Sequence, residues 1–270
     1  MRTYLILAVV LLVSGFVLST GNGRSDDGGG EAASYGFDRN YPDGDTAQDV
    51  GFAVLELFTS EGCSSCPPAE SLLNTIAAEA ERTGRPVYAL AFHVDYWNRL
   101  GWKDRFSRPE YSARQRKYAE AMKLRSVYTP QMVLNGSVEF VGSNAETARS
   151  RITDALDDTI SLPLRLSLTQ EEEDVIASYV VETKKEMVVN LALVESALVT
   201  DIPRGENAGR TLHHDNVVRL FVEGKTDTEG RGYVRFSLPE GVDAEHSAVI
   251  AYVQEPSTMQ VLGAARVAMR

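Results

Sequence analysis

Two cysteines with two residues between them, Cys63 and Cys66, are the side chains of this sequence best suited to chemistry. They follow an apolar run at residues 53–58, and a helical pattern begins at the Pro67-Pro68 pair directly after them. A helix N-terminus exposes unpaired N–H groups and the positive end of the helix dipole, which stabilise a thiolate and lower the thiol pKa below about 8.5. Two cysteines at this spacing can also close a disulfide. The pattern therefore predicts a redox-active dithiol at the start of a helix.

Three other interpretations of this cysteine pair stay open. Cysteines two residues apart can form half of a zinc site, an inert disulfide, or two small buried side chains. The chain has two cysteines in all, which excludes a four-cysteine zinc site. The strand before the pair and the helix after it favour the redox interpretation.

Composition limits the number of domains and the kinds of partner. The chain has 270 residues, of which 43% are hydrophobic. This length predicts about two domains at ~150 residues each. The formal net charge of -11 argues against a nucleic acid or an anionic membrane surface as a partner.

The first residues have the pattern of a targeting segment. Arg2 is followed by an apolar run at residues 5–18 and then by small polar residues, which predicts a signal peptide at residues 1–21. The run is short for a membrane span, which needs about 20 apolar residues, and an uncleaved membrane anchor is the alternative. Residues 22–49, rich in Gly, Asp, Ser and Asn, predict a flexible linker. The mature chain is therefore expected to be secreted or periplasmic, where a disulfide persists.

The first half of the remaining chain has an α/β pattern. Strands and helices are predicted in the order strand, helix, strand, helix, strand, strand, helix, at residues 53–58, 67–82, 87–93, 110–124, 132–134, 138–141 and 143–158. Asn135-Gly136 between the last two strands is a strong hairpin signal. The order predicts an α/β domain at residues 50–160, a mixed sheet flanked by helices. The basic residues of the second helix, Arg114 among them, are expected on a solvated face.

The second half has a different pattern, with short alternating segments separated by turn residues. Seven strands are predicted at residues 164–168, 175–181, 187–194, 216–221, 233–238, 248–254 and 261–267. About seven such strands indicate an all-β, sandwich-like domain at residues 161–270.

The order of the first half is similar to the thioredoxin core, in which a cis-proline faces the cysteine pair. The segments that resemble one particular family are FTSEGCSSCPP at residues 58–68, HVDYW at 93–97, GWKD at 101–104, RQ at 114–115, YTPQ at 128–131 and RGENAGRTL at 204–212. Together they resemble the secreted, thioredoxin-like family called domain of unknown function twelve-twenty-three, from about residue 54 to the C-terminus. The resemblance implies a thioredoxin-like fold and extracytoplasmic thiol chemistry, and it supplies no substrate.

The chain departs from ordinary thioredoxins around the cysteines. Gly62 precedes Cys63 where thioredoxins have tryptophan, and Ser64-Ser65 stand where they have Gly-Pro. The redox potential of thioredoxins therefore cannot be transferred. The two serines could donate hydrogen bonds to a thiolate, or they are simply exposed residues at a helix start.

Roles follow for the cysteines and for the residues expected opposite them. Cys63, expected to be the more exposed, is the predicted nucleophile, and Cys66 the resolving thiol. Pro130 matches the cis-proline of that fold in chain order. A cis-proline there would leave the backbone N–H and carbonyl of Thr129 free to pair with an extended substrate. Trp97 is expected to wall the substrate groove or to pack over the sheet edge.

Three polar residues are candidates for proton transfer. His93 and Asp95 end the second predicted strand, where alternation places them on one face, and such a pair could shuttle a proton. Glu61 lies close to Cys63 in sequence and could accept a proton. The alternatives are a structural histidine and a solvated glutamate.

A polar loop in the second half is a further candidate. Its match to the family motif predicts that Glu206, Asn207 and Arg210 dock near the cysteine pair, with His213 and His214 close behind them in sequence.

The sequence as a whole predicts an extracytoplasmic thiol–disulfide oxidoreductase with no cofactor and no resident metal. Its partners would be protein or small-molecule thiols and disulfides and a redox partner protein, with no nucleic acid. A metal-binding or metal-delivery protein using Cys63, Cys66 and a histidine such as His93 or His214 is one alternative. A non-catalytic binding module on a thioredoxin scaffold is the other.

Overall fold

A computed structural model describes residues 51–158 and 162–269 of the chain. The signal peptide and linker predicted at residues 1–21 and 22–49 lie outside these residues. No helix within the described ranges is both long and apolar enough to cross a membrane.

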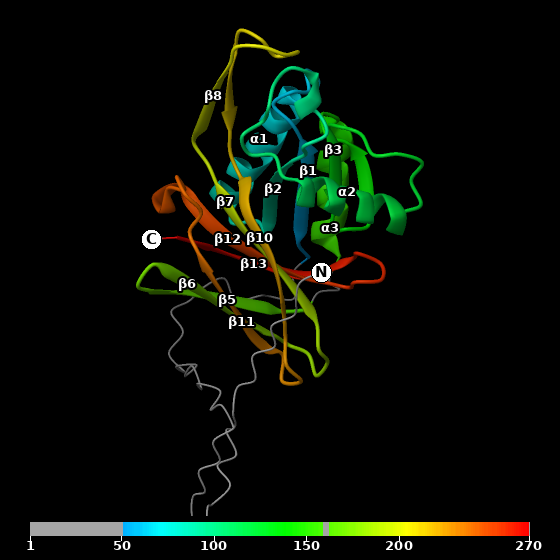
Figure 1. Ribbon diagram of the computed structural model, residues 1–270. Helices are drawn as coiled ribbons and strands as arrows, with labels where there is room; N and C mark the ends of the chain where they lie inside the picture. The colour runs from blue at the N-terminus through cyan, green and yellow to red at the C-terminus, as the bar shows by residue number, and fades with distance from the viewer. Residues whose placement is uncertain (1–50, 159–161, 270) are drawn as a thin grey trace, which may run out of the picture. The chain divides into compact units, whose positions relative to one another are not determined.

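The first half contains the seven elements in the order that the sequence predicts (Figure 1). They are β1 (Ala53–Thr59), α1 (Pro67–Thr83), β2 (Val87–His93), α2 (Pro109–Ala121), β3 (Gln131–Leu134), β4 (Val138–Val141) and α3 (Ala145–Asp157). Strand β1 pairs in parallel with β2 and antiparallel with β3. At the β3–β4 turn Asn135 and Gly136 both have positive φ, 45° and 67°.

Alternation along β1 assigns the helices to the two faces of the sheet. Leu55 and Leu57 pack with residues of α1 and α3, such as Leu73. Val54 and Phe58 face the other way and pack with Tyr118 of α2. Both faces are covered, which explains why β1 is buried along its whole length.

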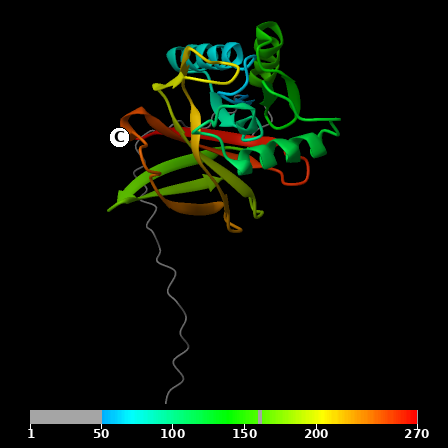
Figure 2. The same ribbon diagram turned by 45° about the horizontal axis from the view of Figure 1, so that its top comes forward.

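The second half adds nine strands. They are β5 (Leu164–Glu171), β6 (Asp174–Val181), β7 (Val188–Glu195), β8 (Leu198–Ile202), β9 (Arg210–His214), β10 (Val217–Lys225), β11 (Arg231–Ser237), β12 (Ser247–Gln254) and β13 (Val261–Ala268). Strands β5, β6 and β11 form a three-stranded sheet whose apolar face packs on β7, β12 and β13. Figure 2 shows this sheet below the larger sheet, with α1 and α3 above.

One sheet runs through both halves of the chain. Its strand order is β13-β12-β7-β10-β2-β1-β3-β4, so strands from beyond the expected boundary at residue 160 continue the sheet of the first half. The two halves join where Val217 of β10 pairs with Ala91 of β2. The Ala91 N–H donates to the Asn216 carbonyl at 2.8 Å. All the described residues belong to one compact unit.

The β8–β9 hairpin was not among the predicted strands, because its short, polar sequence shows little alternation. It forms a two-stranded sheet of its own and rises beside α1 (Figure 1). It matters for function because its connecting loop, residues 203–209, reaches the cysteine pair.

The expectation of a solvated Arg114 is wrong. The side chain is buried, and Nε and Nη2 donate to the two carboxylate oxygens of Glu56 at 2.6 and 2.8 Å. Nη2 also donates to the hydroxyl groups of Tyr118 and Tyr252, both at 2.8 Å. Glu56 lies on the face of β1 that α2 covers, so the two charges are buried as a pair.

Candidate redox site

The cysteine pair lies in a turn between β1 and α1. A disulfide joins Cys63 and Cys66, and Cys66 is the residue before the first helical residue. Both cysteines therefore lie directly before the helix and not on its first turn. Pro67 and Pro68 have no N–H, and the N–H groups of the next two residues donate to the Cys66 carbonyl at 2.9 and 3.1 Å. These four residues therefore offer no free backbone N–H group to a thiolate at the cysteine pair.

Hydroxyl groups, not amides, contact the sulfur of Cys63. The Oγ atoms of Ser65 and Thr129 each lie 3.3 Å from Cys63 Sγ. Trp97 Nε1 in turn donates to Thr129 Oγ1 at 2.8 Å, which fixes the threonine beside the sulfur. The sulfur thus has polar neighbours although it is buried.

The expectation that Cys63 is the more exposed cysteine is wrong, because both cysteines are 0% exposed. The loop at residues 203–209 covers them. Asn207 Nδ2 donates to the carbonyl groups of Glu61 at 2.8 Å and Cys63 at 3.0 Å. The Ser64 N–H donates to Glu206 Oε2 at 3.1 Å.

These contacts confirm that the polar loop of the second half docks at the cysteine pair. Arg210 contributes indirectly, since its Nη1 donates to Asn207 Oδ1 at 3.1 Å. Gly205 has φ of +85°, and a Cβ there would lie 3.1 Å from Trp102 Cβ. A glycine is therefore required for the loop to pack this closely.

The peptide bond between Thr129 and Pro130 is cis, as predicted. Pro130 is buried, and its carbonyl accepts from the Gly142 N–H at 2.9 Å. Thr129 and Trp97 are both half-buried. The structure thus brings Thr129, Pro130, Trp97 and the disulfide together.

The expected pairing of His93 with Asp95 is wrong. Strand β2 ends at His93, and the loop that follows turns Asp95 toward α2, where it accepts from Ser112 Oγ at 2.5 Å. His93 Nδ1 instead lies 2.7 Å from Asp104 Oδ2, and both residues are buried. The same oxygen of Asp104 accepts from the Glu61 N–H at 2.9 Å. Sequence distance hid this partner, which comes from the loop before α2.

A second histidine pair lies next to the first. His214 Nδ1 is 2.5 Å from Glu70 Oε2, and His214 Nε2 is 3.3 Å from Glu61 Oε1 without hydrogen-bond geometry. Trp102 Nε1 donates to the other oxygen of Glu61 at 2.7 Å. Glu61 is 0% exposed, so the alternative of a solvated glutamate is wrong. The two imidazole ring centroids are 5.2 Å apart.

Glu70, like Asp104, is a member of this group that the sequence argument missed. It lies four residues after Cys66 on α1 and is buried beside Leu73. A carboxylate on the apolar stripe of a helix was the signal that could have identified it, since such a charge needs a partner.

The pKa values of the two histidines, His93 and His214, are raised, and those of Asp104 and Glu70 are lowered. Burial lowers the pKa of His214, but attraction to the nearby carboxylates of Glu61 and Glu70 and the hydrogen bond to Glu70 outweigh it and raise the value to about 10. Burial also opposes the charge of His93, whose pKa is nevertheless raised by Asp104. The pKa values of Asp104 and Glu70 are lowered, because the histidines outweigh the effect of burial. Each histidine thus lies beside a carboxylate that favours its protonated form.

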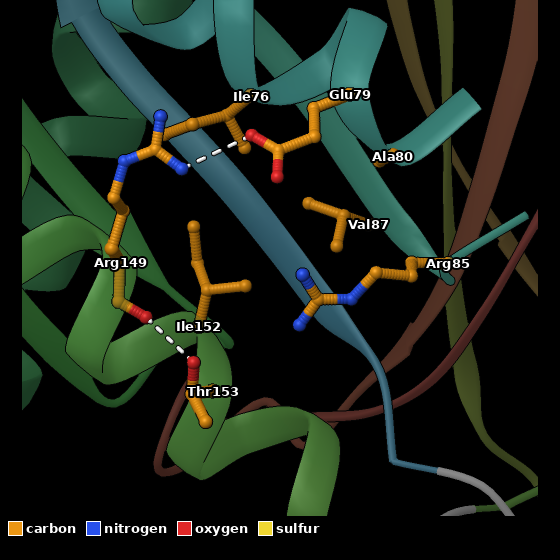
Figure 3. A pocket seen from close by; sticks show the side chains of 8 residues that line it. All are labelled: Ile76, Glu79, Ala80, Arg85, Val87, Arg149, Ile152 and Thr153. Atoms are coloured by element: carbon orange, nitrogen blue, oxygen red, sulfur yellow. Dashed lines mark hydrogen bonds and ion pairs between the residues drawn. The ribbon is translucent and has the colours of Figure 1, made fainter. Parts of the chain in front are cut away.

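Two hollows of the described surface lie away from the cysteines. Figure 3 shows one of about 90 Å³ between α1 and α3, where Arg149 forms an ion pair with Glu79 at 3.0 Å. A larger hollow of about 770 Å³ is lined by residues of α2, β7 and β10, including Phe221. Neither cysteine lines either hollow.

Comparisons relate the chain to known proteins. A family model described as protein of unknown function (DUF1223) matches residues 54–254. The crystal structure of protein AGR_C_4864 from Agrobacterium tumefaciens is similar, with 26% identity and a TM-score of 0.64, over 82% of this chain and 96% of that chain. A β-glucuronidase from Ruminococcus gnavus matches 40% of this chain and 15% of its own, with 14% identity and a TM-score of 0.21. No curated protein matches the chain.

Proposed function

The chain belongs to the DUF1223 family of unknown function, and from its own site we propose that it is an extracytoplasmic thiol–disulfide oxidoreductase with a thioredoxin-like first half. One observation carries the proposal. The Cys63–Cys66 disulfide lies between a central strand and a helix N-terminus, and the hydroxyl of Thr129, which precedes the cis-proline, contacts Cys63 Sγ at 3.3 Å.

The proposed reaction is a two-step exchange. In the reduced protein the Cys63 thiolate attacks a substrate disulfide, forming a mixed disulfide and releasing one substrate thiolate. The Cys66 thiolate then attacks the Cys63 sulfur, which closes the Cys63–Cys66 disulfide and releases the second thiolate. Two electrons pass to the substrate, and a redox partner protein would restore the dithiol. The reverse sequence would oxidise a substrate dithiol.

The residues around the sulfur have defined parts in this proposal. The hydroxyls of Thr129 and Ser65 would donate hydrogen bonds to the Cys63 thiolate, which lies where they already contact the sulfur. Among the described residues no backbone hydrogen bond engages Thr129, so its N–H and carbonyl can pair with an extended substrate segment.

Burial of the disulfide adds a requirement. Since both cysteines are 0% exposed, a substrate can reach them only after residues that pack around them move, and the loop at residues 203–209 is the proposed moving segment. Two side chains, Glu206 and Asn207, hold that loop on the cysteine turn. The loop would therefore act as a cover that limits which disulfides are attacked.

The test is an insulin reduction assay with dithiothreitol, on wild type, Cys63→Ser and Cys66→Ser. Wild type is expected to accelerate insulin reduction, Cys63→Ser to be inactive, and Cys66→Ser to accumulate a mixed disulfide with substrate. Full activity of Cys63→Ser would overturn the proposal.

The burial of both cysteines also favours a second candidate, a binding module in which the disulfide is structural. The reduction potential separates the two. A value below about -300 mV marks a structural bond, and a higher value marks an exchanging one.

A further inference from the structure

We propose that Glu70, His93 and His214 form a binding site for a divalent transition-metal ion such as Zn²⁺, next to the disulfide. Each of these residues offers one ligand atom, and the three atoms lie within 4.8 Å of one another. All three residues are buried, with 6%, 0% and 1% of their surface exposed. They come from α1, β2 and β9, which are three separate parts of the chain.

His93 has a ring nitrogen directed to no described partner. Its Nδ1 is held by Asp104 Oδ2 at 2.7 Å, while the buried Nε2 has no hydrogen-bond partner. A histidine that binds a metal through one nitrogen commonly donates its other N–H to a carboxylate, which orients the ring. His93 has this arrangement without the ion. An unpaired buried nitrogen is costly, and coordination would remove that cost.

His214 and Glu70 supply the other two ligand atoms. His214 Nδ1 and Glu70 Oε2 are 2.5 Å apart and share a proton that a metal ion can replace. The His214 Nε2–H would then face Glu61 Oε1, which is 3.3 Å away and is itself without a hydrogen-bond partner. Glu70 Oε1 accepts from Thr59 Oγ1 at 2.5 Å. Every ligand thus has a group behind it that fixes its orientation.

The charge of the group suits a dication. Three buried carboxylates, those of Glu61, Glu70 and Asp104, surround the two imidazoles. In the part of the chain that the structure describes, these carboxylates form ion pairs with histidines and with no lysine or arginine. Two nitrogens and one oxygen are donors that Zn²⁺ accepts, and three protein ligands leave one coordination position open.

The experiment uses the oxidised full-length protein, in which the cysteines are in a disulfide and offer no thiolate. After treatment with a chelator, Zn²⁺ is titrated by calorimetry, and Co²⁺ absorption reports the geometry. One ion per chain is expected. His93→Gln, His214→Gln and Glu70→Gln should each weaken binding more than about tenfold, and Asp104→Asn should weaken it about tenfold, as for other groups behind a ligand.

The two remaining histidines provide matched controls, since the chain has four in all. His213 and His246 are exposed, and His213→Gln and His246→Gln should bind Zn²⁺ as wild type does. A Cys63→Ser, Cys66→Ser double variant should also retain binding, which separates this site from thiolate coordination and from the redox proposal. Circular dichroism identifies any variant that fails to fold. If a histidine variant does not fold, Zn²⁺ binding by Glu70→Gln, which keeps the shape of the side chain, decides whether the site exists.

The proposal would be overturned if wild type bound no Zn²⁺. It would also be overturned if binding survived in the folded Glu70→Gln protein, or if it were lost in His213→Gln, His246→Gln or the double cysteine variant. Wild type that binds Zn²⁺ and does not accelerate insulin reduction would contradict the redox proposal alone.

Discussion

At the scale of single residues, hydroxyl groups are the polar contacts of the Cys63 sulfur. Thr129 Oγ1 and Ser65 Oγ lie at equal distances of 3.3 Å from its sulfur, while the two prolines after Cys66 remove amide donors from the helix start. Hydrogen bonds to an ionised acceptor contribute about 1.5–3 kcal/mol. These donors should therefore stabilise the reduced protein more than the disulfide.

Thr129→Val tests this contact, because valine keeps the shape of threonine and lacks the hydroxyl. We expect the reduction potential of the Cys63–Cys66 pair to fall by about 30 mV, the equivalent of about 1.4 kcal/mol. The measurement is equilibration with glutathione buffers. Thr75→Val is the control, since Thr75 donates to the Ser71 carbonyl on an exposed part of α1. Equal potentials for wild type and Thr129→Val would contradict the role of the hydroxyl.

The sequence identified some of these residues and missed others for a physical reason. Cys63, Cys66 and Pro130 carry local signals, a fixed spacing and a known place before a strand. The partners of Asp104 and Glu70 are histidines that lie 11 and 144 positions away, so neither pairing has a local signal. Such pairings are set by packing in three dimensions, so the sequence wrongly paired His93 with its near neighbour Asp95.

At the scale of elements, the loop of the β8–β9 hairpin is the proposed cover of the disulfide. Its loop contributes two hydrogen bonds from Asn207 to carbonyl groups of the cysteine turn. The loop motif was apparent in the sequence through family resemblance, but the hairpin that carries it was not. Its strands have five residues each, and apolar and polar side chains are mixed on their exposed faces, as at Val199 and Asp201.

Asn207→Ala should release the loop. Two lost hydrogen bonds, at about 1 kcal/mol each, favour opening and should speed reduction of the disulfide by a small phosphine about tenfold or more. Thr211→Ala, in the same hairpin, is the control, because Thr211 contacts Asp201 and not the cysteine turn. No acceleration in Asn207→Ala would show that the loop does not limit access.

Glu206 should make the cover sensitive to acid. Hydrogen bonds from Ser64 hold the pKa of Glu206 below its ordinary value of 4.5, so the contact is complete above that value and is lost as pH falls through the lowered pKa. We therefore expect the rate of disulfide reduction in wild type, relative to Glu206→Gln, to rise as pH falls from about 4.5 to about 3. A constant ratio of the two rates across this range would rule out the effect.

At the scale of the whole molecule, the two halves share one sheet and one charged cluster. Arg114 of α2 contacts Glu56 of the first half together with Tyr252 and Gln254 of β12. The sequence predicted most strands in both halves, but alternation within a strand does not encode its neighbour. The β2–β10 pairing, which joins 91 to 217, therefore could not be predicted.

Arg114→Leu should destabilise both halves together. Removing one partner of a buried ion pair costs about 3–5 kcal/mol, because the carboxylate of Glu56 is left buried and unpaired. Urea unfolding followed by circular dichroism should show a single transition at lower urea, and hydrogen exchange should show both halves opening together. Arg116→Leu, on the exposed face of the same helix, should unfold as wild type does. Separate transitions for the two halves would contradict one cooperative unit.

The two indole rings of the chain occupy complementary places around the site. Trp97 is hydrogen-bonded to the threonine that contacts Cys63, and Trp102 to the glutamate that faces His214. The intrinsic fluorescence of this protein thus comes from one ring coupled to the state of the sulfur and one coupled to the histidines. With a phenylalanine in place of either ring, the emission of the other becomes a label-free reporter of its own half of the site.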